Sequence, residues 1–135
     1  MKEKELLELI ARFYSEQDLA LIKPHLHSNI QYASAWVLTP LIGTNEFLRY
    51  FEAKIKTMIA ANVKMVAKVS PLQYKGNHFF ILEQNGDSAN RIIVEVKFKQ
   101  GRIFSIYLSP EHQAPFTFQT PAKSYLKALE TMKRL

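Results

Sequence analysis

Two alternating segments joined by a short turn dominate the second half of the sequence. Apolar and polar residues alternate from residue 91 to residue 99, with Ile92, Val94, Val96 and Phe98 on one side. Gln100-Gly101 and a second run, residues 102–109, follow directly. A period of two is that of a β-strand, and a turn dipeptide between two such runs predicts a β-hairpin. Any fold for this chain has to accommodate this hairpin.

Three further segments have the pattern of strands. We expect strands over residues 29–38, 63–69 and 78–84, the last with apolar residues on both faces. Ser70-Pro71 predicts the end of the second of these strands. Turns are expected at residues 75–77 and at Asn85-Gly86-Asp87.

Helical spacing marks the two ends of the chain and one central segment. The apolar residues within 4–15 lie on one stripe of an expected first helix. Asp18 is the expected cap of a short second helix, whose length Pro24 limits. Thr44 is the expected N-cap of a helix that runs to about residue 61, with Glu46 in its first turn. Its expected buried stripe comprises Phe47, Phe51, Ile55, Met58 and Ile59. A last helix is expected over residues 121–134. The sequence thus predicts an α+β fold in one domain, residues 1–135.

Composition narrows the function classes. The chain has no cysteine, which excludes disulfides and thiolate chemistry. The first residues read as an amphipathic helix and not as an export signal, and no apolar run is long enough to cross a bilayer. We therefore expect a cytoplasmic protein without a membrane partner. The net charge of +6 raises nucleic acid as a partner. The bases are spaced as solvated faces without interleaved aromatics, so we expect no nucleic-acid binding.

The strand at residues 29–38 carries an unusual set of side chains on one face. Ile30, Tyr32, Ser34 and Trp36 point the same way. A core made only for packing uses Val, Ile or Leu, whereas buried Tyr and Trp need partners for their polar atoms. Either this face fills a core, with the hydroxyls reaching the surface, or it lines a pocket. We expect a pocket lined by Tyr14, Tyr32, Ser34, Trp36, Tyr50, Phe51 and Tyr107.

Several segments together resemble the nuclear transport factor 2-like, SnoaL-like superfamily. They are ARFY at the end of the first helix, DLALIKPHL, NIQYASAWV, GTNEFLRYF and the hairpin IVEVKFKQGRIFSIYL. The resemblance covers about residues 1–109, and the helix after Pro121 is an addition. It implies a curved antiparallel or mixed sheet wrapped around the N-terminal helices in a cone, with a pocket at the open end. Members include ketosteroid-isomerase-like enzymes, cyclases, dehydratases and binding proteins.

The resemblance also implies where catalytic groups would lie. The base aspartate of the isomerase-like members falls at Ser34, and a serine cannot serve as that base. Glu95 lies near the position of their late-strand acid, but its alternation with Arg91 and Lys97 predicts a solvent-facing, salt-bridged glutamate. Glu83 has apolar neighbours on both faces and is the better candidate for a perturbed carboxylate, unless the end of its strand lies in water. His78 opens the same strand and is a third candidate.

Histidine also raises the possibility of a metal. His25 and His27 share a face of an extended chain, which is half of a metal site, but no third ligand lies nearby in the sequence. His112, after the last strand, is a candidate lid residue or a surface histidine. We therefore expect neither a metal nor a cofactor.

The expected strand over residues 78–84 is apolar on both faces, so its face away from the helices also has to be covered. Phe80, Leu82 and Ile93 are expected on the face away from the helices. A homodimer, formed sheet against sheet or through the last helix, would cover them.

Three functions remain open on these grounds. The first is binding of a small apolar or aromatic molecule in the cone. The second is an isomerase, dehydratase or cyclase that uses Glu83, Glu95 or His78 beside the tyrosines. The third is an accessory domain that binds protein or nucleic acid through its basic surface.

Overall fold

The described chain consists of one mixed sheet with helices on one of its faces. The computed structural model describes residues 1–34, 39–74, 77–87 and 91–110, with the backbone alone for residues 70–74. The strands lie in the order β2-β1-β6-β5-β4-β3. β1 and β6 are parallel, and the other neighbours are antiparallel. The described elements are α1 (Glu3–Glu16), η1 (Leu19–Leu21), η2 (Lys23–His25), β1 (Leu26–Ser34), β2 (Leu41–Ile42), α2 (Thr44–Ala60), β3 (Met65–Tyr74), β4 (Asn77–Gln84), β5 (Arg91–Lys99) and β6 (Arg102–Pro110).

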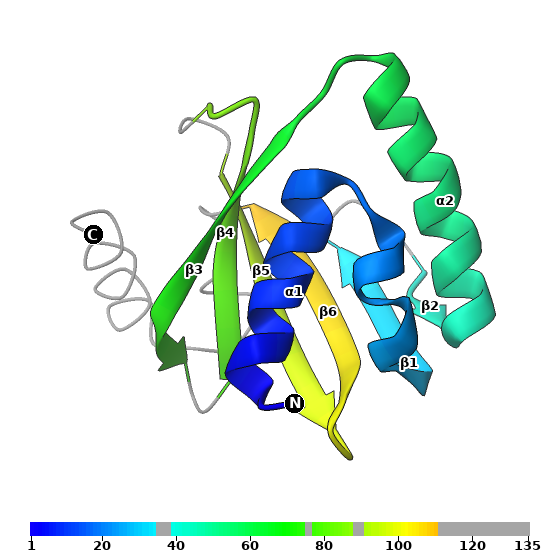
Figure 1. Cartoon of the computed structure of the whole chain (residues 1–135), viewed down its shortest axis with the longest axis vertical. Helices are drawn as coiled ribbons and strands as arrows, with labels where there is room; N and C mark the ends of the chain where they lie inside the picture. Colours follow the sequence, from blue (N-terminus) through cyan, green and yellow to red (C-terminus); the bar gives the residue numbers. More distant parts are fainter. Residues whose placement is uncertain (35–38, 75–76, 88–90, 111–135) are drawn as a thin grey trace.

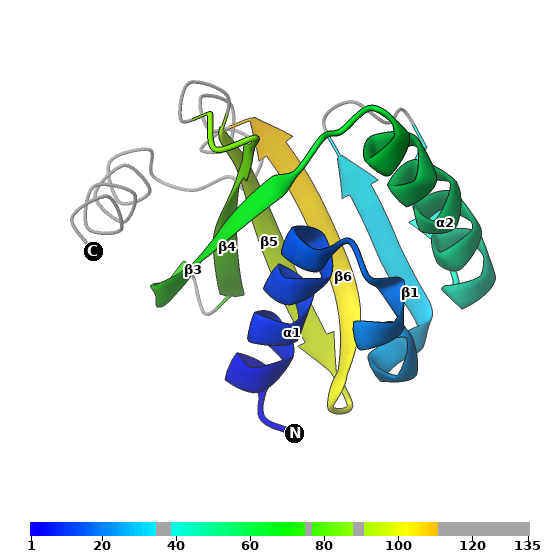
Figure 2. The ribbon, with the colours of Figure 1, turned by 45° about the horizontal axis from the view of Figure 1, so that its top comes forward.

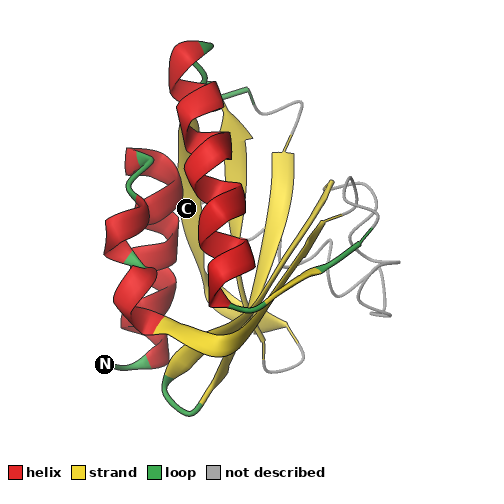
Figure 3. Ribbon diagram, turned by 90° about the vertical axis from the view of Figure 1, so that its right-hand side faces the viewer, coloured by secondary structure: helices red, strands yellow, loops and turns green. Residues whose placement is uncertain are grey.

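Both long helices lie on the same face of the sheet (Figure 3). α1 runs along β3 and β4, and α2 lies over β1. Figures 1 and 2 show α1 in front of the middle of the sheet and α2 at the right, beside β1, with the short helices η1 and η2 between them. None of the helices in the described ranges is long and apolar enough to span a bilayer. The predicted α+β class is confirmed.

The β5–β6 hairpin forms as the sequence predicts. Lys99 pairs with Arg102 across Gln100 and Gly101, whose φ angles are 55° and 72°. Two successive positive φ angles define the type I′ turn that matches the twist of a hairpin, and a glycine adopts one without strain. The pairing changes register between Lys97 and Phe98 on β5. This irregularity determines which side chains of β6 reach the helices.

The first strand and its return differ from the prediction. β1 begins at Leu26, three residues before the predicted start at Asn29. A two-residue strand that the pattern did not reveal, β2, pairs with Gln31 and Tyr32. Gly43 ends this return with φ of 98°, and its N–H donates to the carbonyl of Ile30 at 2.8 Å. The backbone thus turns directly from β2 into α2.

The predicted break at Ser70-Pro71 is wrong. β3 continues through both residues to Tyr74, with irregular pairing between Val69 and Gln73. β3 is the edge strand of the sheet. A proline is tolerated on an edge strand or where the pairing is irregular, and Pro71 meets both conditions.

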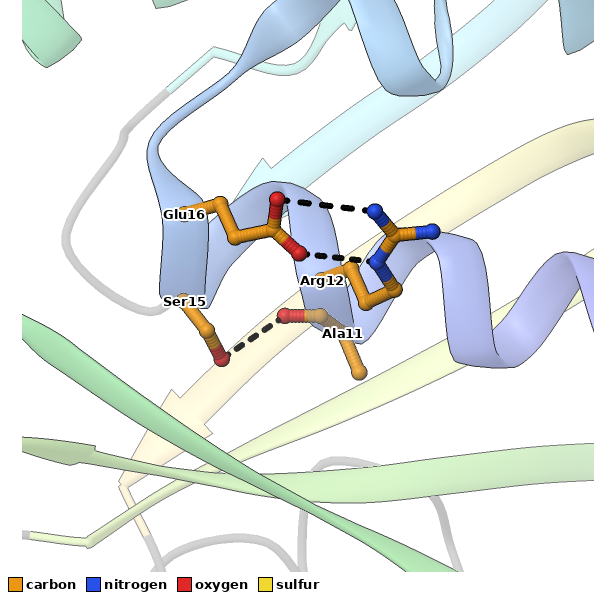
Figure 4. Close-up of polar contacts among 4 residues, drawn as sticks. All are labelled: Ala11, Arg12, Ser15 and Glu16. Atoms are coloured by element: carbon orange, nitrogen blue, oxygen red, sulfur yellow. Dashed lines mark hydrogen bonds and ion pairs between the residues drawn. The ribbon is translucent and has the colours of Figure 1, made fainter.

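The C-terminal half of α1 is held by local polar contacts (Figure 4). Arg12 Nε donates to Glu16 Oε2 at 2.7 Å, and Ser15 Oγ donates to the carbonyl of Ala11 at 3.0 Å. Such exposed contacts are screened by water and add little to stability. As predicted, Asp18 then caps η1 by accepting from the N–H of Ala20 at 3.1 Å.

The start of α2 differs from the prediction in its cap. Gly43, and not Thr44, is the N-cap, and the Thr44 hydroxyl donates to the carbonyl of His27 at 3.2 Å. Glu46 lies in the first turn as expected and accepts from the N–H of Ile42 at 3.2 Å. The stripe of α2 is buried at Phe47 and Phe51, whereas Ile59 is 59% exposed. The second half of the helix is therefore less buried than its sequence predicts.

Phe51 is the centre of an aromatic cluster that joins α1, α2 and β1. Its ring centroid lies 5.3 Å from Phe13, 6.1 Å from Tyr14, 4.9 Å from Tyr32, 4.6 Å from Phe47 and 5.1 Å from Tyr50. Several of these contacts are edge-to-face, the geometry that aromatic rings favour. This cluster fixes both helices against the sheet.

The side chains of β4 that face the helices differ from those predicted. Phe80 and Leu82 are buried in the core against the helices. Ile93 lies on the outer face as predicted, opposite Ile81, and Phe79 shares that face with Glu95. Phe79, Ile81 and Ile93 are already buried. They offer little free apolar surface to a partner, and the homodimer stays a prediction.

Parts of the prediction lie outside the described residues. These are Trp36, residues 75–76 of the predicted turn, His112 and the helix at 121–134.

Replacing the central ring of the cluster should be costly. We expect Phe51→Ala to lower the free energy of unfolding by about 3–5 kcal/mol because it leaves a cavity where helices and sheet meet. Ile59→Ala, an exposed position on the same helix, should change it by about 0.5 kcal/mol or less. Urea denaturation followed by circular dichroism measures both. Similar losses in the two variants would contradict the central role of Phe51. If Phe51→Ala does not fold, Phe51→Leu provides the comparison.

Candidate functional site

Three tyrosines from three elements converge beside Phe51. Tyr14 comes from the last turn of α1, Tyr32 from β1 and Tyr50 from the middle of α2. The rings of Tyr32 and Tyr50 are 5.4 Å apart, and both pack on Phe51. We call Tyr14, Tyr32 and Tyr50 the tyrosine cluster. The sequence predicted each of them as a pocket residue.

The hydroxyl groups of this cluster differ in their hydrogen bonding. Tyr32 is fully buried and Tyr14 is 7% exposed, and neither hydroxyl forms a hydrogen bond of ordinary geometry with the described residues, although the phenol of Tyr50 is close enough to Tyr32 to act on its pKa. The Tyr50 hydroxyl accepts from Lys54 Nζ at 3.2 Å. A buried hydroxyl without a partner costs free energy and is uncommon in folded proteins. Both of these hydroxyls belong to tyrosines whose rings pack against Phe51.

The phenols of Tyr14 and Tyr32 stay protonated over the physiological range. Burial, together with the neighbouring phenols, raises the pKa of Tyr14 and the pKa of Tyr32 above the ordinary value of a tyrosine. A phenol with a raised pKa is an O–H donor at neutral pH. These two hydroxyls can therefore donate hydrogen bonds and do not act as bases.

Lys54 adds a charge that we did not predict at this site. Its ammonium lies 5.4 Å from the centroid of the Tyr50 ring. Lys54 is half-buried, and no carboxylate of the described chain forms an ion pair with it. From the sequence we expected it to be one of the solvated bases. The spacing of Tyr50 and Lys54, four residues apart on one helix, was the available signal.

Ser34 also lies on the helix-facing side of the sheet. It is buried on β1 and pairs with Leu108 of β6. Because this position of β1 carries a serine and not a carboxylate, it does not supply a general base. Trp36 lies outside the described residues.

Tyr107 does not join the cluster. It pairs with Glu95 of β5 and Ala33 of β1, and these residues lie on the outer face. Strict alternation from Ile103 would have turned Tyr107 toward the helices. The register shift in β6 places both Ile103 and Ile106 in the core and moves Tyr107 to the other side. The prediction of Tyr107 as a pocket residue is corrected on this ground.

Glu83 lies on the outer face in an ion-paired environment. Its carboxylate is 2.8 Å from Lys68 Nζ and 3.3 Å from Arg91 Nε, and the residue is 2% exposed. The hydrogen bond from Lys68 above all, with that from Arg91, outweighs burial and lowers the pKa of this carboxyl. The carboxylate is perturbed, as expected, but it is separated from the tyrosine cluster by the sheet.

Glu95 is buried, so the predicted solvent-facing glutamate is wrong. The residue is 8% exposed and accepts from Asn77 Nδ2 at 2.9 Å. Burial raises the pKa of its carboxyl, although Lys97 and the bond from Asn77 act in the opposite direction. It pairs with Phe79 and Tyr107 on the outer face. It too lies across the sheet from the tyrosines.

His78 and His27 contact other parts of the described chain. His78 Nε2 is 3.5 Å from Glu3 Oε1, at the start of α1. Tyr14 is eleven residues beyond Glu3, about 16 Å along the same helix. His27 Nε2 is 3.0 Å from Gln100 Oε1, and its Nδ1 accepts from the N–H of Asn29. Within the described residues, no three His, Cys, Asp or Glu side chains are placed to hold a metal.

Known structures share this architecture. A proposed isomerase of the SnoaL-like family from Agrobacterium tumefaciens is 16% identical with a TM-score of 0.62, over 79% of this chain and 95% of its own. An NTF2-like protein of unknown function from Cytophaga hutchinsonii is 14% identical with a TM-score of 0.58, over 86% and 96%. A proposed polyketide cyclase from Sinorhizobium meliloti is 13% identical with a TM-score of 0.57, over 77% and 93%.

These likenesses define the class of fold. The chain has the α+β cone fold of the NTF2-like, SnoaL-like superfamily. At such low identity they carry the fold alone. The sequence matches no family model and no curated protein.

The two outer-face glutamates should respond to pH with opposite signs. The folded-state pKa of Glu83 is lowered, so its contribution to stability is present above the unfolded pKa, about 4.3, and is lost as the pH falls through the folded one. Glu83→Gln should therefore destabilise by about 1–3 kcal/mol at pH 7 and by less at pH 3. Urea denaturation at both pH values measures the change.

Glu95 provides the matched comparison. Its folded-state pKa is raised, so stability falls as the pH rises from the unfolded pKa through the folded one. Glu95→Gln removes that penalty and still accepts from Asn77. We expect it to stabilise the protein at pH 7 and to have no such effect at pH 3. The same sign for both variants at pH 7 would contradict the assigned environments.

Proposed function

We propose that this protein binds a small, largely apolar molecule that carries a hydrogen-bond acceptor, at the tyrosine cluster. The observation that carries the proposal is the pair of buried, unpartnered hydroxyls of Tyr14 and Tyr32. An oxygen acceptor on a ligand would satisfy both donors at once.

The surroundings of the hydroxyls support an apolar or aromatic ligand body. Phe51 and Phe13 pack against Tyr14, and Phe47 packs against Tyr32. Small-molecule sites combine mostly apolar and aromatic walls with a few polar groups that orient the ligand. A flat molecule with one oxygen group fits these requirements.

The chemistry of the cluster favours binding over acid–base catalysis. A general base must come within hydrogen-bond reach of the substrate. Glu83 and Glu95 lie on the outer face of the sheet and His78 lies at the other end of α1. The likeness to a proposed isomerase and a proposed cyclase keeps an enzyme as the alternative, but Glu83 and Glu95 lie across the sheet from the tyrosines.

Removing the unpartnered hydroxyls should make the ligand-free protein more stable. Tyr14→Phe and Tyr32→Phe should each raise the free energy of unfolding by about 1 kcal/mol, because the desolvation cost of a buried donor disappears. The matched control is Tyr50→Phe, which loses the bond from Lys54 and should be neutral or destabilising by up to about 1 kcal/mol. Destabilisation by all three substitutions would show that the hydroxyls already have partners.

The same variants should lose ligand binding. We choose 2-acetylnaphthalene, a flat fluorescent ketone, and 2-ethylnaphthalene, which has the same ring and no oxygen. Wild-type protein should bind the ketone more tightly, and Tyr14→Phe and Tyr32→Phe should each reduce that preference by about threefold or more. Fluorescence titration measures the dissociation constants. Equal binding of both compounds by the wild type would contradict the proposal.

A further inference from the structure

The groups that surround the proposed site share one property, which is that all of them can donate a hydrogen bond. Tyr14 and Tyr32 present unpartnered O–H groups. Tyr50 accepts from Lys54 and keeps an O–H of its own, close to the phenol of Tyr32. Lys54 contributes an ammonium with three donors. Such a set matches a ligand group that only accepts.

The charge at this site is also unbalanced. Lys54 is half-buried beside the Tyr50 ring and has no ion-pair partner in the described part of the chain. The acidic residues buried in that part, Glu83 and Glu95, lie on the opposite face of the sheet. A partly desolvated ammonium without a counter-ion attracts an anion more strongly than an exposed one does.

We propose that the ligand is an apolar carboxylic acid, bound as its carboxylate with the oxygens toward Tyr14, Tyr32 and Lys54. This inference rests on the proposed function and adds the chemical class. A carboxylate has two oxygens that accept several hydrogen bonds, and such charge-assisted bonds are about twice as strong as neutral ones. A neutral ketone offers one oxygen and leaves the charge of Lys54 unmatched. Lys54 is then the residue that selects an acid over a neutral analogue.

The test compares two naphthalene compounds that differ in the oxygen group. Wild-type protein at pH 7 should bind 2-naphthoate about tenfold more tightly than 2-acetylnaphthalene. Lys54→Met keeps a long apolar side chain and removes the ammonium. It should raise the dissociation constant of 2-naphthoate about tenfold and change that of 2-acetylnaphthalene by less than about twofold.

The control variant is Lys56→Met on the exposed side of the same helix. It should leave both dissociation constants unchanged, which separates a local contact from the net charge of the protein. Circular dichroism spectra and urea midpoints of the variants confirm that each is folded.

The possible outcomes separate this inference from the proposed function. If the ketone binds through Tyr14 and Tyr32 but 2-naphthoate is no tighter, the proposed function stands and the acid preference is overturned. If Lys54→Met leaves the preference intact, or if Lys56→Met removes it equally, Lys54 does not select the acid. If neither compound binds, both proposals fail.

Discussion

The packing of aromatic rings around Phe51 is the interaction on which the rest of the described structure depends. It brings the end of α1, the middle of α2 and the strand β1 to one point. Because Tyr14 and Tyr32 are held there by their rings, their hydroxyls are positioned by apolar packing and not by polar partners. The donors of the proposed site are thus fixed before a ligand arrives, which lowers the entropic cost of binding.

The sheet separates two kinds of chemistry. Its helix-facing side carries phenols and, from α2, the ammonium of Lys54. Its outer side carries two buried carboxyls, one paired with Lys68 and Arg91 and one bonded to Asn77. Neither carboxyl can take part in acid–base chemistry at the phenols from the outer face of the sheet. The distribution of charge therefore favours recognition of an acceptor over proton transfer.

The sequence predicted much of this fold because alternation and turn residues are local signals. The strand Arg91–Lys99 and its hairpin have the expected bounds, and Tyr14, Tyr32, Tyr50 and Phe51 lie together as expected. Features that depend on neighbouring strands were not predictable. Pro71 is compatible with β3 because that strand is at the edge, and Tyr107 faces outward because a register shift in β6 interrupts the alternation.

A crystal structure of the full chain grown with 2-naphthoate tests the central claim most directly. We expect the naphthalene ring against Phe51 and the carboxylate oxygens within hydrogen-bond distance of the Tyr14 and Tyr32 hydroxyls, with Lys54 nearby. A structure in which the two hydroxyls bond to protein groups and the naphthoate is absent from the cluster would contradict it. In that case the tyrosines are part of a filled core, and the function lies elsewhere on the molecule.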